Sequence, residues 1–481
     1  MANVHRRLYV AIVCLGAIAC RPVEPSLDQE AGHRADVGIT ADASRLLDGG
    51  AVAEGGSLVD AGRALCGDGV LDAGEACDDG NTVETDDCAN DCTPTAPFRA
   101  YDDEITGLLA RYNVAGATVA VTQDERLVFL RAYGHSHRAE ERPMERHHRM
   151  RIASLSKPIT AVAVLLLVEQ GRLRLDDAAF AFFDDVSPPA GQELDPRLAD
   201  ITVRHLLVHA GGWNRAESGD PMFKSRLIAQ ALEIPGPATA EDTLRYMLGQ
   251  PLDFAPGSDY HYSNFGYSVL GRIIERVTGQ DYEAFVQQQV LAPMGIDGME
   301  IGRTFPADQP TDEVHYHLYE GAMDVISVFP EIDGRVPRTE GGWHQEALDS
   351  HGGWIANAAD LARFLTGVDG RPHRPDVLSA ASIETMTARP QIAHWEGRNA
   401  FYAMGWMIRP NRSDANWWHN GALPGTSTFF VRTGEGLSWV ILTNGRPQES
   451  NQFLSDLDSA LWRAAGTVAE WPDYDLFDRR P

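Results

Sequence analysis

The sequence predicts an α+β fold, with one antiparallel sheet built from both ends of a domain, flanked by helices and joined to a helical subdomain. Two observations support this prediction. Strand-like runs occur early, at residues 117–133, and late, at residues 402–442, while helical periodicity dominates between them. Hydrophobic residues make up 43% of the 481 residues and charged residues 23%, which is typical of a folded protein with a large core.

The predicted strands fall into two groups. Residues 117–122 and 126–133 have the pattern of a hairpin around Gln123, Asp124 and Glu125. The later strands are expected at 402–408, 427–431 and 438–442. Pairing of the two groups would close a single sheet, because the helical segment lies between them in the sequence.

The predicted helices include one of unusual composition, from Ser154 to Gln170. Its apolar positions nearly encircle it, so we expect it to be buried in the middle of the domain. Other helical patterns occur at 202–209, 241–249, 265–278, 281–291, 358–367 and 451–465.

The N-terminus is typical of an export signal, which we assign to residues 1–20. Two arginines precede an apolar run of 12 residues, too short to span a bilayer. The run ends at Cys20, which allows two interpretations: cleavage after small residues, or a lipobox in which Cys20 carries a lipid. Both interpretations place the mature protein outside the cytoplasm, as a cell-envelope lipoprotein or a secreted protein, with the lipid as its only membrane contact.

Residues 21–65 have no hydrophobic period and are interpreted as a flexible linker. Residues 66–92 contain Cys66, Cys77, Cys88 and Cys92, which in an exported protein indicate two disulfides with three possible pairings. The segment resembles a short cysteine-rich repeat of myxobacterial surface proteins. Its spacing does not match common zinc sites and it lacks the ordered ligands of an EF-hand, so we interpret it as structural.

The charge of the chain excludes one class of function and highlights two residues. A formal net charge of −28 repels phosphate backbones, so we expect no nucleic-acid partner. Of the 41 basic residues only Lys157 and Lys224 are lysines. A buried lysine can lose its proton, whereas an arginine cannot.

The chemistry begins with Ser154 and Lys157. Residues three apart on a helix share a face, so both side chains can point into one cavity. A serine hydroxyl becomes a good nucleophile when a neighbouring base takes its proton, and a lysine with a lowered pKa can be that base. Ser156, next to Lys157 in the sequence, should face another side of the helix. Taken alone, Ser154 would be an ordinary helix-start serine and Lys157 a solvated charge.

Two further motifs change this interpretation. Tyr262-Ser263-Asn264 precedes a predicted helix, where the phenol can lie against the Ser/Lys pair and Asn264 can bind a substrate carbonyl. His419-Asn420-Gly421 follows an aromatic strand, and Gly421 allows a close backbone approach to a ligand. Taken alone, Tyr262 would be a core aromatic and His419 a histidine satisfied beside a sheet.

In this order, Ser-x-x-Lys, Tyr-x-Asn and His-x-Gly resemble the serine β-lactamase and penicillin-binding protein superfamily, over about residues 98–470. The class C-like branch, with its esterases and D-aminopeptidases, is most similar. Segments 206–212 and 352–361 and an expected strand at Gly405-Trp406 support the match. The resemblance implies an acyl-enzyme on Ser154, with Lys157 and Tyr262 sharing the roles of general base and proton shuttle. It also implies an oxyanion hole from the backbone N–H groups of Ser154 and Ala422, and no cofactor.

One departure bears on the substrate. Typical β-lactamases have Lys-Thr-Gly where this chain has His419-Asn420-Gly421, and a mostly neutral histidine is a poorer partner for a carboxylate. This favours an esterase or D-amino-acid peptidase acting on a small ester, amide or peptide. The alternatives are a β-lactamase or D,D-carboxypeptidase and, from another class, a non-catalytic surface or peptidoglycan-binding protein. His205 and His209 have the spacing of a zinc pair but lack the accompanying glutamate, so no metal is expected.

Overall fold

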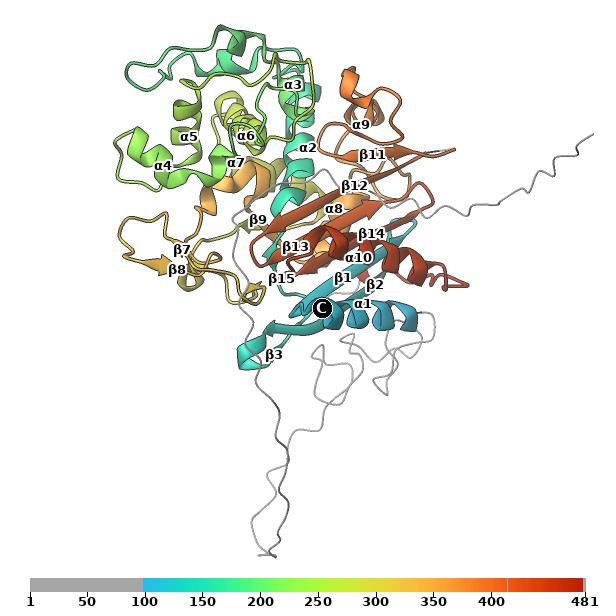
Figure 1. Cartoon of the computed structure of the whole chain (residues 1–481). Helices are drawn as coiled ribbons and strands as arrows, with labels where there is room; N and C mark the ends of the chain where they lie inside the picture. Colours follow the sequence, from blue (N-terminus) through green and yellow to red (C-terminus); the bar gives the residue numbers. More distant parts are fainter. Residues whose placement is uncertain (1–97, 413, 479–481) are drawn as a thin grey trace, which may run out of the picture.

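The computed structural model describes residues 98–412 and 414–478, and its central feature is an eight-stranded sheet in the order β10-β11-β12-β13-β14-β1-β2-β3. All neighbouring strands are antiparallel, and β1 pairs with both β2 and β14, so the two ends of the domain meet in one sheet as predicted (Figure 1). The strands are β1 (Gly116–Gln123), β2 (Arg126–His137), β3 (Arg142–Pro143), β10 (Phe401–Tyr402), β11 (Met407–Pro410), β12 (Ala415–Leu423), β13 (Thr426–Arg432) and β14 (Leu437–Thr443). The expected signal peptide, linker and cysteine-rich repeat lie outside the described residues.

The two faces of the sheet are covered by different helices (Figure 1). On one face, α1 (Arg99–Tyr112) and α10 (Ser450–Ala465) pack against each other and against apolar side chains of β1, β2 and β14. On the other face lie α8 (Ala358–Thr366) and the larger core that contains α2 (Ser156–Glu169). Eleven of the 14 residues of α2 are buried, which confirms the prediction of a helix enclosed on nearly all sides.

A helical subdomain lies beside α2 (Figure 1). It contains α3 (Val203–Leu207), α4 (Ser225–Ala231), α5 (Ala240–Met247), α6 (Asn264–Thr278) and α7 (Tyr282–Val286). Of these, α6 packs directly on α2 and thereby brings the Tyr262 motif to the Ser154 motif. No helix of the described residues is long and apolar enough to cross a membrane.

The remaining elements are short. Strands β4 (Met150–Arg151), β9 (Trp354–Ala356) and β5 (Glu300–Ile301) form a small sheet that holds the entry to α2. Strand β6 (His317–Leu318) pairs in parallel with β15 (Gly445–Arg446), and β7 (Val325–Ile326) pairs with β8 (Arg335–Val336). One more helix, α9 (Ala380–Thr387), precedes β10.

The prediction of one strand over residues 402–408, including Gly405-Trp406, is wrong. The chain forms two strands, β10 and β11, that pair antiparallel across a tight turn. Gly405 sits in that turn at φ = 88°, a left-handed conformation that glycine adopts without steric cost. Helices α1, α4 and α9 were not among the predicted helices.

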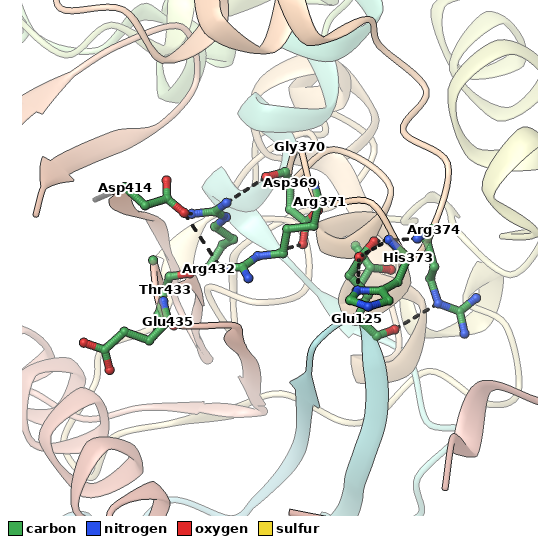
Figure 2. A network of polar contacts seen from close by, with 12 residues as sticks. Glu125, Asp369, Gly370, Arg371, His373, Arg374, Asp414, Arg432, Thr433 and Glu435 are labelled. Carbon is green, nitrogen blue, oxygen red and sulfur yellow. Dashed lines mark hydrogen bonds and ion pairs between the residues drawn. The ribbon is translucent and has the colours of Figure 1, made fainter. Parts of the chain in front are cut away.

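A polar network fixes the loop after α8 to one end of the sheet (Figure 2). Glu125, in the β1–β2 turn, accepts backbone N–H groups of His373 at 2.7 Å and Arg374 at 2.8 Å. Arg432 forms an ion pair with Asp414 at 2.6 Å and donates to the carbonyl of Asp369. Burial, reinforced by the charge of Glu125, raises the pKa of the Asp369 carboxyl to about 7.

Candidate active site

Ser154 lies in a strained turn at the entry to α2. A single 3₁₀ turn, Ala153–Leu155, precedes the helix, and Ala153 has φ = 51°. This left-handed conformation costs a non-glycine residue about 1 kcal/mol, so the surrounding structure must impose it. Ala153 is buried, and the Thr428 hydroxyl of β13 donates to the carbonyl of Ile152 at 2.9 Å. The sheet therefore holds the turn that carries Ser154.

The side chain of Lys157 is fully buried beside Ser154. Its Nζ lies 3.2 Å from Ser154 Oγ, 2.8 Å from Asn264 Oδ1 and 2.7 Å from the carbonyl oxygen of His351. The last two oxygens accept hydrogen bonds only. A neutral amine has two N–H groups and one lone pair, so donating to these two acceptors directs its lone pair toward the Ser154 hydroxyl. This is the geometry of a base next to its nucleophile.

Asp220 settles which end of the Asn264 amide faces the lysine. Asn264 Nδ2 donates to Asp220 Oδ2 at 2.6 Å, and a carboxylate can only accept. The amide nitrogen therefore faces Asp220 and the amide oxygen faces Lys157. The motif predicted Asn264 at the site, but its oxygen contacts the Lys157 amine, and the expected contact with a substrate carbonyl stays a prediction.

The surroundings of Lys157 favour its neutral form. Burial lowers the pKa of its amine well below the ordinary value, Asp220 opposes this shift, and Arg215 adds to it. The lysine can therefore hold a free lone pair at a working pH where an exposed lysine could not.

The ring of Tyr262 lies next to the pair, with Lys157 Nζ 4.8 Å from the ring centroid. Its hydroxyl is buried and forms no well-aligned hydrogen bond with any described residue. Burial raises the pKa of this phenol, although the nearby Ser154 hydroxyl and Arg215 guanidinium oppose the rise. Tyr262 is therefore a protonated O–H group at neutral pH.

His419 lies on β12 with its ring centroid 6.2 Å from that of Tyr262. Its Nδ1 is 2.7 Å from the Asn420 carbonyl and its Nε2 is 3.0 Å from the Tyr402 hydroxyl. The carbonyl can only accept, so Nδ1 carries the proton and Nε2 accepts from the tyrosine. Burial lowers the pKa of His419 to about 3, so the imidazole is neutral.

Gly421 brings β12 against the turn that carries Ser154. A Cβ at this position would lie only 2.5 Å from the carbonyl oxygen of Ile152 and 3.1 Å from the Cβ of Ala153. The close approach at Gly421 is therefore to the protein's own backbone, and the approach to a ligand expected from the sequence stays a prediction. Ala422 follows on the same strand, opposite Ser427, and is half-buried. Its role in an oxyanion hole stays a prediction.

Sequence reasoning missed several residues around the site. Arg215 and Asp220 lie in a loop with no recognisable motif, and the His351 carbonyl belongs to the π-helical turn Asp349–Gly353. The sequence indicated His209 only as part of segment 206–212 and of a possible zinc pair. Its ring lies 4.3 Å from that of Tyr262, and it accepts the Ser263 N–H at 3.1 Å, just before α6.

The two histidines with zinc-pair spacing have separate structural roles. His205 completes a capping box at the start of α3, whereas His209 packs among aromatic rings. Within residues 98–412 and 414–478, no group of three or more His, Cys, Asp or Glu side chains could hold a metal ion.

Comparison with known proteins identifies the family. The pattern of the family described as Beta-lactamase matches residues 101–459, three quarters of the chain and all three motifs. The chain belongs to the beta-lactamase family. It is thus a serine hydrolase whose fold is shared by penicillin-binding proteins, esterases and amidases.

The chain is similar to two proteins by sequence and to one solved structure that bear on its function. Penicillin-binding protein 4* of Bacillus subtilis is 24% identical over 365 residues, covering 75% of this chain and 74% of the relative. Esterase EstB of Burkholderia gladioli is 28% identical over 358 residues, covering 70% and 87%. The solved D-amino acid amidase of Ochrobactrum anthropi shares the fold with a TM-score of 0.59 at 22% identity, covering 77% of this chain and 99% of that one.

Proposed function

We propose that this chain is an exported hydrolase that cleaves an ester or amide through an acyl-enzyme on Ser154, with the substrate range of an esterase or D-amino-acid peptidase. The observation that carries the proposal is the set of three contacts around Lys157 Nζ, which leave its lone pair for the Ser154 hydroxyl. Export rests on the signal sequence predicted in residues 1–20.

In the acylation step, Lys157 Nζ takes the proton of Ser154 Oγ while that oxygen attacks the substrate carbonyl. The resulting oxyanion receives hydrogen bonds from the backbone N–H groups of Ser154 and Ala422. The tetrahedral intermediate collapses, the bond to the alcohol or amine breaks, and the leaving group takes a proton. Water then repeats the sequence on the acyl-enzyme, and the proton returns to Ser154 Oγ.

The opposite pKa shifts of Lys157 and Tyr262 support a division of the two proton-transfer roles. The lysine, with its lowered pKa, is suited to accept the serine proton. The phenol, with its raised pKa, is suited to pass a proton to the leaving group while it receives one from the lysine ammonium. We therefore assign the base to Lys157 and the proton shuttle to Tyr262.

The neutral His419 supports an esterase or amidase rather than a dedicated β-lactamase or D,D-carboxypeptidase. With Nδ1 donating to the Asn420 carbonyl and Nε2 accepting from Tyr402, the ring offers a substrate carboxylate neither charge nor a free N–H. The names of two relatives, Esterase EstB and D-amino acid amidase, agree with this choice.

The direct test is labelling with a fluorophosphonate probe, followed by peptide mapping. We expect one covalent adduct, on Ser154, and none on the Ser154→Ala variant. Ser156 and Ser263 are internal comparisons, because their hydroxyls hydrogen-bond to the Ala153 carbonyl and the Gly266 N–H. An adduct on either would overturn the assignment of the nucleophile.

A parallel screen of chromogenic esters, D-amino-acid amides and β-lactams determines the substrate class. Turnover of esters or amides, with little of β-lactams, is the expected result. Failure to label Ser154 together with no turnover of any substrate would favour the non-catalytic surface protein.

A further inference from the structure

The loop between α3 and α4 places a positive charge over the ring of Tyr262. The guanidinium carbon of Arg215 lies 4.8 Å from the centroid of this ring. The loop is ordered by its own hydrogen bonds: Asn214 N–H donates to Asp253 at 2.6 Å, and Ser218 Oγ donates to the same carboxylate at 2.9 Å. The chain on both sides of Arg215 is therefore bonded to Asp253, while the guanidinium itself lies over Tyr262.

The acidic side chains around this loop all have other partners. Glu217 accepts from the Asn214 amide, Asp253 holds the loop, and Asp220 accepts from Asn264 and from the Met222 N–H. Among the described residues Arg215 has no hydrogen bond or ion pair of its own. A half-buried arginine over an aromatic ring, without an acceptor for its N–H groups among the described residues, is suited to receive an anion.

The other basic groups around the nucleophile are poor partners for an anion. Burial lowers the pKa values of His209, His351 and His419, so their rings are neutral. Lys157 must be neutral to act as the base. Arg215 thus supplies the positive charge beside Tyr262, and it comes from the helical side of the site rather than from β12.

We propose that Arg215 is the binding site for a carboxylate on the acyl part of the substrate, so that the preferred substrates are esters or amides whose acyl chain carries a negative charge a few bonds from the scissile carbonyl. This charge is distinct from a carboxylate on the leaving group, for which His419 offers no partner. This inference rests on the proposed function of Ser154 and defines its substrate class. The guanidinium forms hydrogen bonds with the carboxylate oxygens, and no covalent step is involved.

The test compares 4-nitrophenyl hemiglutarate with its neutral methyl ester, which differ in the distal charge and in one methyl group. For the wild-type protein, kcat/KM corrected for the uncatalysed rate should be roughly 10- to 100-fold higher for the charged ester, as expected for a charge-assisted hydrogen bond. In Arg215→Gln this ratio should fall toward one, and Arg215→Lys should retain part of it. Arg226→Gln, which removes one exposed cation from α4, is the matched control and should leave the ratio unchanged.

A binding measurement separates this proposal from the proposed reaction. In Ser154→Ala, calorimetry should show tighter binding of the charged ester, and adding Arg215→Gln should abolish the difference. A wild-type ratio near one, or a ratio insensitive to Arg215→Gln, would overturn the carboxylate site even if Ser154 is the nucleophile. An equal fall in Arg226→Gln would also overturn it, because the preference would then come from overall charge.

Discussion

Replacing Lys157 by arginine separates proton transfer from positive charge at the site. An arginine keeps a cation and hydrogen-bond donors next to Ser154, Asn264 and His351, but it stays protonated at any working pH. If the lysine only stabilises charge or structure, the variant should lose little activity. If it removes the serine proton, the reaction should lose its base.

The structure sets the expected size of the effect. Lys157 Nζ is 3.2 Å from Ser154 Oγ, and its two shorter contacts are to oxygens that cannot take up a proton in its place. Loss of a positioned general base typically costs 10²- to 10⁴-fold. We therefore expect kcat to fall by on the order of 10³-fold, which corresponds to about 4 kcal/mol in the barrier. The fall should be comparable with that of Ser154→Ala.

The assay is steady-state hydrolysis of a chromogenic ester, combined with thermal unfolding of each variant. We expect Lys157→Arg to shift Tm by only a few degrees, because the larger side chain overpacks a single site. Lys157→Met, which has no amine and a similar length, covers the case in which arginine does not fit. Lys224→Arg is the control, since that lysine lies on the surface loop and donates to the Ser218 carbonyl at 2.5 Å. This substitution should leave kcat and Tm unchanged.

A single outcome would refute the assignment of the base. If Lys157→Arg kept more than about a tenth of the wild-type kcat, base duty would have to pass to Tyr262 alone. The raised pKa of that phenol makes this outcome unexpected.

Three further predictions concern Asp220, Gly421 and Asp369. Asp220→Asn keeps an acceptor for Asn264 but removes a charge that raises the pKa of Lys157. The acidic limb of the pH profile of kcat/KM should therefore move to lower pH. A limb that does not move would show that Lys157 is not the titrating base. Gly421→Ala should lower kcat at least 10-fold, because the added Cβ would press on the turn before Ser154. The measurement is ester hydrolysis, with circular dichroism as the folding control. Full activity would disprove the close packing. The pKa of the Asp369 carboxyl is raised to about 7, so the folded state binds the carboxyl proton more tightly than the unfolded state does. The protonated carboxyl therefore contributes most to the free energy of unfolding below the ordinary carboxyl pKa. This contribution is lost as the pH rises to about 7. Asp369→Asn should therefore stabilise the protein at pH 8 by roughly 2 to 4 kcal/mol, with little effect at pH 4, as measured by denaturant unfolding.

The fold was predictable where the pattern was local and long. The first hairpin, the buried α2 and the long α6 each carry a continuous periodic signal, and the structure confirms them. The errors arose where a contact distant in sequence, or a single residue, overrides the pattern. Gly405 interrupts a run that otherwise has the composition of one strand, and α1 owes its place to packing against α10 at the other end of the chain.

The pairing of Ser154 with Lys157 can be predicted from the sequence alone, because residues three apart at a helix start share a face whatever surrounds them. The charge and orientation of these groups depend on the folded chain around them. The burial that lowers the pKa of Lys157, the carboxylate of Asp220 that orients the Asn264 amide and the neutral state of His419 all depend on elements far apart in the sequence. Arg215 belongs to no motif, and its importance is visible only where the fold places it over Tyr262. A spacing rule describes neighbours along one helix, whereas a pKa depends on the dielectric and on every charge the fold brings near.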